Sequence, residues 1–172
     1  GGEIVNSYLR DNGVTDDEMV LSSVSISPTY TSQYDEEGRY LGDIQSGYEL
    51  TQSMTVTSQD IDKVELISRD ISNLIESGVE LQSNLPEYYY TKLDELKLDL
   101  ITKATANAKE RIDLVASGCG AQTDQLLTAS LGVFQITATN SGTESYSYGG
   151  SFNTSSRFKT ANITVRLNYS VK

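Results

Sequence analysis

The chain reads Gly47-Tyr48-Glu49-Leu50-Thr51-Gln52-Ser53-Met54-Thr55-Val56 and then, after a short gap, Asp60-Ile61-Asp62-Lys63-Val64. Apolar residues alternate with polar ones from Tyr48 to Val56, which predicts a strand with one buried face and one solvated face. Ser58 or Asp60 can cap the helix that follows, and Asp62 adds a carboxylate to its first turn, where negative charge complements the helix dipole. The stretch therefore predicts a strand that leads into a helix, and both carboxylates have a structural explanation.

The segments on either side predict the rest of the first half. Residues before Asn12-Gly13 follow helical spacing, and this pair is a helix stop that needs a left-handed residue. A strand over Val20–Ile26 is then expected to lead past Pro28 to a tip at residues 34–38. Apolar residues after Asp60 recur at the helical period until Gly78 ends the helix.

The second half begins with a short strand, which we predict over Val79–Leu85. A long helix follows over about residues 91–117, and at 1.5 Å per residue it is roughly 40 Å long. Its apolar stripe consists of Leu93, Leu96, Leu100, Ala104, Ala108, Ile112 and Val115. Two more strands are expected: one that changes its buried face near Val133, which predicts a bulge or twist, and a closing strand over Ile163–Val171.

A segment rich in Gly, Ser and Tyr separates the last two strands, over residues 140–159, and predicts a long hairpin loop. Loops of this length are uncommon and are often functional or disordered. The candidate partner-binding residues are Tyr146, Tyr148, Phe152 and Phe158. Aromatic side chains combine a large contact area with few rotamers, which suits binding surfaces. Contact with a partner or neighbouring subunit and disorder in a monomer stay open as alternatives.

The order of elements predicts an α+β fold, a mostly antiparallel sheet with two main helices packed on one face. Residues 1–172 are expected to form a single domain, because a chain of this length buries about 70% of its unfolded surface around one core. The strand-then-helix order occurs twice, which leaves room for two related strand-strand-helix halves.

Composition excludes several classes of function. The 13 basic and 24 acidic residues give a net charge of -11, so nucleic acid and anionic lipid are not expected partners. No apolar run approaches the ~20 residues that a transmembrane helix needs. The chain has no His, which excludes Ser-His and Cys-His nucleophiles and His-ligated metals. The acidic triplets at 16–18 and 35–37 lack the ligand spacing of a calcium loop. We therefore expect no enzyme, no metal and no cofactor.

Two further features have a structural and a functional interpretation. Cys119 is the single cysteine and follows the long helix, where the helix dipole disfavours a thiolate, so a redox-sensing thiol is the weaker interpretation. The triplet Tyr88–Tyr90 is expected to close the sheet edge against the long helix, and a binding surface is the alternative.

Several motifs, taken in order, resemble the SIMPL domain family. They are Ser27-Pro28-Thr29-Tyr30, Gly47-Tyr48, Met54-Thr55-Val56 and Asp60-Ile61-Asp62-Lys63-Val64. Ala108–Gly118 and Ile163–Val171 are similar to later parts of the family pattern, so the resemblance runs from about Leu9 to the C-terminus. The structural positions of the motif are Pro28, Tyr30, Gly47, Tyr48, Asp60 and Asp62.

The resemblance implies an exported bacterial protein of the periplasm, cell envelope or extracellular space, in a family that includes oxidative-stress defence factors without a defined activity. The family begins with a Gly-rich strand, a second strand and a full helix. The resemblance therefore implies that a leading segment is missing, and such a segment would be a route to membrane association.

Two hypotheses on function follow. The first is a non-enzymatic envelope or periplasmic protein that acts by forming homo-oligomers or by binding a protein partner, through strand edges and the Tyr-rich hairpin. The alternative is a module that binds a small molecule or glycan on Tyr side chains. A pocket lined by Tyr and carboxylates would favour the second hypothesis.

Overall fold

The computed structural model describes residues 1–141 and 152–172. Within them it contains three α-helices, two 3-10 helices and eight strands, and every two-stranded ladder is antiparallel. The fold is therefore α+β, as predicted. The chain divides into two compact units, Gly1–Pro86 and Glu87–Lys172, which we call the N-terminal and C-terminal units.

The helices of the N-terminal unit end where glycines allow a left-handed backbone. Helix α1 spans Gly2–Asp11, and the chain leaves it through Gly13 at a φ of 83°. Helix α2 (Ile61–Asp70) continues into the 3-10 helix η2 (Ile71–Ser77), which Gly78 ends at a φ of 78°. A second 3-10 helix, η1, spans Asp16–Glu18. Both predicted stops are confirmed, because only glycine adopts such angles without strain from a Cβ atom.

One hydrophobic core holds the N-terminal unit together. Its buried residues are Val5, Leu9, Val14, Ile67, Ile71 and Val79. They come from α1, α2, η2 and the segments that flank them, so the core is a contact between helices. The short ladder of β1 (Met19–Leu21) and β4 (Met54–Val56) adds the side chains of Met19, Met54 and Val56.

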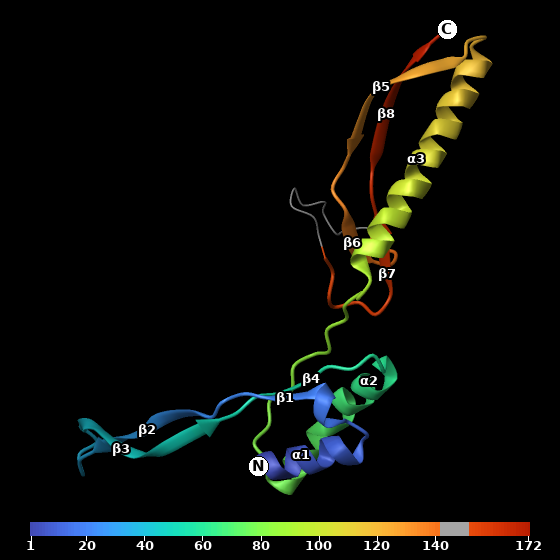
Figure 1. The fold of residues 1–172 in the computed structure, drawn as a ribbon. Coiled ribbons are helices and arrows are strands. Elements are labelled where there is room, and N and C mark those ends of the chain that lie inside the picture. The colour runs from blue at the N-terminus through green and yellow to red at the C-terminus, as the bar shows by residue number, and fades with distance from the viewer. Residues whose placement is uncertain (142–151) are drawn as a thin grey trace. The chain divides into compact units, whose positions relative to one another are not determined.

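The ladder continues beyond this core as a second pair of strands, β2 (Ser25–Tyr34) and β3 (Tyr40–Thr51). The β1–β4 and β2–β3 ladders are separated by a break in both strands, where the Ser22 amide donates to the Ser53 carbonyl at 2.9 Å. The Ser53 amide in turn donates to Ser22 Oγ at 2.9 Å. The β2–β3 hairpin therefore extends away from α1 and α2, as Figure 1 shows.

The C-terminal unit is built on α3 (Leu93–Gly118), which lies alongside β5 (Thr123–Leu131) and β8 (Val165–Val171) in Figure 1. The predicted stripe from Leu93 to Ile112 is at least half-buried. Val115 does not belong to it, because this side chain is 68% exposed and Ala116 is buried in its place. Side chains four residues apart form one ridge along a helix, so the residue that follows Ile112 on the buried ridge is residue 116.

The strands of the C-terminal unit are also interrupted once. Strand β5 pairs with β8, and β6 (Gln135–Ala138) pairs with β7 (Lys159–Asn162). At the break the Gly132 amide donates to the Thr164 carbonyl at 2.7 Å. The irregularity predicted near Val133 is confirmed, while the closing strand predicted over Ile163–Val171 begins only at Val165.

Two further expectations differ from the structure. No residue from Val79 to Lys92 belongs to a helix or strand, so the short strand predicted over Val79–Leu85 is wrong. Val79 is buried because it closes the helical core, which explains its apolar character without a strand. The described strands form four two-stranded ladders in place of one sheet. In the N-terminal unit α2 follows the strand pair, as in the expected strand-strand-helix order, whereas in the C-terminal unit α3 precedes its strands.

Candidate interaction surface

The β2–β3 hairpin has one apolar and one polar face. In an antiparallel pair, opposite residues share a face, and so do alternate residues of one strand. Ile26 pairs with Leu50, and Pro28 pairs with Tyr48. The apolar residues of the first face are Ile26, Pro28, Tyr30, Tyr34, Tyr40, Tyr48 and Leu50, and the same face also carries Ser32, Asp43 and Gln45, because Tyr30 pairs with Gln45 and Ser32 pairs with Asp43. We call it the apolar face. The polar face consists of Ser25, Ser27, Thr29, Thr31, Gln33, Glu49 and Thr51, with Ile44 as its apolar exception.

The apolar face is exposed. Tyr48 and Leu50 are each 64% exposed, Ile26 is 62% exposed, and the other three Tyr side chains lie between 58% and 62%. Strands β2 and β3 contact mainly each other. The expectation that Tyr48 and Leu50 face a core is therefore wrong, although Met54 and Val56 do pack against one. The alternation is real, but the core of the N-terminal unit ends at β4.

Charged groups order the tip of the hairpin. The Asp35 carboxylate accepts hydrogen bonds from the amides of Glu37 at 3.0 Å and Arg39 at 2.8 Å. Arg39 also donates from Nε to Asp35 at 2.7 Å and pairs with Glu37 at 2.5 Å. Hydrogen bonds from the Arg39 amide and side chain hold the pKa of Asp35 below its ordinary value. The predicted tip is confirmed, and its carboxylates are explained by the turn.

Aromatic and polar contacts stiffen the end of the apolar face. The rings of Tyr34 and Tyr40 meet edge to face, with centroids 5.9 Å apart. Ser32 Oγ donates to the Asp43 carboxylate at 2.7 Å, and a hydrogen bond from the Tyr40 hydroxyl to Asp43 raises the pKa of Tyr40. The Asp43 carboxylate, which lies on the apolar face, is thus hydrogen-bonded within the same two strands.

The family-motif residues divide between this hairpin and the helix after it. Pro28, Tyr30, Gly47 and Tyr48 all lie on β2–β3, and Gly47 lies opposite Thr29. Asp60 caps α2 by accepting a hydrogen bond from the Lys63 amide at 3.1 Å, as predicted. Asp62 lies in the first turn of α2. The structure brings the first four together and gives the two carboxylates helix-terminal positions.

A polar cluster in the N-terminal unit joins segments that are distant in sequence. Glu18 pairs with Lys63 at 2.7 Å and accepts a hydrogen bond from Ser58 Oγ at 2.5 Å, while Lys63 Nζ also donates to the Gly13 carbonyl at 3.1 Å. The hydrogen bonds from Lys63 and Ser58 lower the pKa of Glu18 from 4.5 to about 2. The side chains of Glu18 and Lys63 are each 19% exposed, so the cluster is part of the packed unit. The cluster could not be predicted from the sequence, since no local spacing connects residues so far apart.

The C-terminal unit has a similar cluster. Lys109 pairs with Asp113, which also accepts a hydrogen bond from Thr123 Oγ1, and Lys109 Nζ lies 5.2 Å from the centre of the Tyr169 ring. Hydrogen bonds from Lys109 and Thr123 lower the pKa of Asp113. These contacts tie α3 to β5 and β8, which is a structural role.

The predicted partner-binding loop is only partly described. Tyr146 and Tyr148 lie outside the described residues. Phe152 is 54% exposed and approaches Phe134 with ring centroids 6.3 Å apart, and its backbone bridges to Ile136. Phe158 is 71% exposed, with the Arg157 guanidinium 5.9 Å from its ring centre. The two phenylalanines therefore contact different neighbours.

The Tyr triplet and the cysteine lie at the two ends of α3. The Tyr88 amide donates to the Thr154 carbonyl at 2.7 Å, whereas Tyr89 is 69% exposed and donates its hydroxyl hydrogen bond to Glu87. The first residue of the triplet thus binds to the C-terminal unit through its backbone, while Tyr89 is largely exposed. Cys119 is exposed at the C-terminal cap of α3, as predicted.

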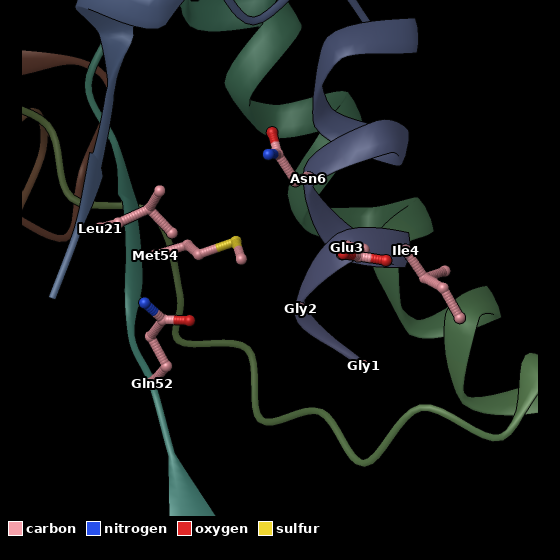
Figure 2. A pocket seen from close by; sticks show the side chains of 8 residues that line it. All are labelled: Gly1, Gly2, Glu3, Ile4, Asn6, Leu21, Gln52 and Met54. Carbon is pink, nitrogen blue, oxygen red and sulfur yellow. The ribbon is translucent and has the colours of Figure 1, made fainter. Parts of the chain in front are cut away.

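Figure 2 shows a hollow in the N-terminal unit, the kind of feature that a small-molecule or glycan site would need. It has a volume of about 490 Å³, is largely open to solvent, and lies between the start of α1 and the strand segments that carry Leu21 and Met54. The Met54 side chain points toward α1, and Glu3 is the one carboxylate side chain in the lining. No Tyr lines this hollow, so it does not have the composition expected of a glycan-binding site.

The described residues also bear on metal sites and membrane spans. Residues 1–141 and 152–172 contain no group of three or more His, Cys, Asp or Glu side chains that could hold a metal ion. None of the helices in this part of the chain combines the length and apolar character needed to cross a bilayer.

Comparison with known proteins identifies the scaffold. No curated protein matches the chain. The model of the SIMPL family, described as a protein of unknown function, matches residues 3–172, which is nearly the whole chain and includes both units. The chain therefore belongs to the SIMPL family.

Proposed function

We propose that this chain is a non-enzymatic protein of the bacterial envelope or periplasm that works by self-association or by binding a protein partner, in the setting of stress defence. The proposal rests on the exposed apolar face of the β2–β3 hairpin, where four Tyr, Ile26 and Leu50 are each about 60% exposed. The largest apolar patch on an ordinary monomer covers about 300–600 Å² and is often functional. Tyr side chains suit such a surface because they combine apolar area with a polar tip.

The lack of His supports a non-enzymatic role, since it excludes the commonest general base. The two clusters with lowered carboxylate pKa values, around Glu18 and Asp113, each pair the acid with a Lys and a hydroxyl that tie elements together. A catalytic acid needs its pKa near the working pH, and these shifts run in the opposite direction.

A photo-crosslinking amino acid tests this function in bacterial cells that produce the protein. It is placed at Tyr48 on the apolar face and, as the matched control, at Thr51 on the polar face of the same strand. Irradiation followed by cell fractionation should give covalent adducts at Tyr48, in the exported fraction, and few at Thr51. A chain that forms no adduct at either position and elutes as a monomer would refute an interaction role.

A further inference from the structure

We propose that the occupant of the apolar face of the hairpin is the same face of a second copy of this chain, packed against it as a two-layer sheet. This inference rests on the proposed function and commits it to one partner and one surface. Its starting observation is that the seven apolar residues of the face come from one hairpin and lie on one side of it.

The exposed area fits a dimer interface. Large aromatic side chains bury about 150–250 Å² each, so four Tyr and two aliphatic residues at about 60% exposure present roughly 700 Å². A stable pair of proteins buries about 800 Å² on each partner. The face alone therefore supplies most of the area that such an interface needs.

The face is also self-complementary in chemistry. A two-fold interface joins a patch to its own copy, so the seven apolar residues of the face meet the apolar residues of the same face in the partner. The face also carries one carboxylate, Asp43, which lies opposite Ser32 and accepts hydrogen bonds from Ser32 and Tyr40 of its own chain. These hydrogen bonds reduce the free-energy cost of covering this carboxylate with a facing copy.

The hairpin gains stability from such a partner. A two-stranded hairpin is marginal in water unless a further layer covers its apolar face. Strands β2 and β3 have 10 and 12 residues, and their register shifts twice, between Thr29 and Tyr30 and between Gln33 and Tyr34. Two hairpins stacked about 10 Å apart bury both apolar faces and leave both polar faces in solvent. A second copy is always present at the same concentration as the first, so it is available to cover the apolar face permanently.

Light scattering after gel filtration of the purified full chain tests the inference. The wild type should have twice the 18.8 kDa mass of one chain. Leu50→Lys on the apolar face should raise the dissociation constant by on the order of 10–100-fold. Thr51→Lys adds the same charge one residue away on the polar face and should leave the mass unchanged. Circular dichroism should show that both variants are folded.

A disulfide test keeps the inference falsifiable if Leu50→Lys fails to fold. In a Cys119→Ser background, Tyr30→Cys places a thiol near the middle of the apolar face, and Thr31→Cys places one on the polar face. Mild oxidation should link two copies of the first variant and not of the second. Equal linkage of both variants would overturn the assignment of this face.

The outcomes separate this inference from the proposed function. A wild type that stays monomeric at every concentration overturns the second-copy assignment, while adducts of a different mass at Tyr48 would still support partner binding. A dimer that Leu50→Lys does not weaken overturns the assignment of the surface and leaves self-association standing. A monomer without adducts refutes both.

Discussion

At the scale of single residues, Glu18 is the carboxylate whose environment the fold changes most clearly. Lys63 and Ser58 hold its pKa near 2, against an ordinary value of 4.5. A carboxylate with a lowered pKa in the folded state stabilises the fold fully above the unfolded pKa, and this contribution disappears as the pH falls through the folded pKa. The stabilisation from Glu18 should therefore be present above about 4.5 and lost toward pH 2.

We predict that Glu18→Gln lowers the melting temperature at pH 6, because it leaves the half-buried Lys63 ammonium without its carboxylate. The gap between wild type and variant should close as the pH falls from about 4.5 toward 2. Thermal unfolding followed by circular dichroism across this range measures it. The control is Asp17→Asn, which removes one charge from the exposed neighbour of Glu18. A gap that is constant with pH would contradict the assigned cause.

How well residue roles could be predicted depended on sequence distance. Asp60 was identified as a cap because a cap and the amide it binds are three residues apart, and the structure confirms this bond. The pair of Glu18 and Lys63 could not be found in this way, since 45 positions separate the two residues. The β1–β4 ladder brings them together, because Met19 pairs with Val56 and the Thr57 amide donates to the Glu18 carbonyl at 2.8 Å.

At the scale of elements, α1 is held in place by few side chains. Leu9 is 2% exposed and is the most deeply buried apolar residue of the N-terminal core. Its carbonyl also accepts the Val14 amide at 3.0 Å, which fixes the turn after the helix. Removal of the side chain beyond Cβ should therefore leave a cavity between α1 and the helical segments of α2 and η2.

We predict that Leu9→Ala lowers the free energy of unfolding by about 2–5 kcal/mol, the range for large-to-small substitutions in cores. The same substitution at Leu66, which is 46% exposed in α2, should cost below about 1 kcal/mol. Urea unfolding followed by circular dichroism compares the two variants. The chain has two compact units, and the C-terminal unit does not contain Leu9. If this unit unfolds in a separate transition, the urea midpoint of that transition should be the same in Leu9→Ala as in the wild type. Similar losses for both variants would contradict the burial of Leu9.

The elements also show what periodicity can establish. The stripe on α3 was correct from Leu93 to Ile112, because a helix packed along its length must repeat its contacts at the helical period. The alternation through Tyr48 and Leu50 gave the correct face and the wrong environment. Alternation identifies which residues share a side of a strand, whereas cover for that side comes from distant parts of the chain or from another molecule.

At the scale of the whole molecule, the sequence predicted the α+β class and the family, and it did not predict the division into two units. Local patterns specify most of the helices and strands, but the boundary at Pro86 depends on which elements share a core. The exposure of the β2–β3 hairpin could not be predicted for the same reason. Its residues looked like core residues because their pattern is the same as that of strands which are covered.

Net charge adds a last expectation for the whole chain. Each copy carries -11, so two copies repel each other at low salt, and only the apolar contact between their hairpins opposes that repulsion. The Debye length falls from about 30 Å at 0.01 M salt to about 8 Å at 0.15 M, and screening should therefore favour the dimer. We predict that the dissociation constant decreases by roughly a few-fold over this range. Sedimentation equilibrium at increasing potassium chloride measures the change, with the protein concentrations matched between salts. An interface made of ion pairs would weaken instead, so a dimer that dissociates as salt rises would contradict an apolar contact.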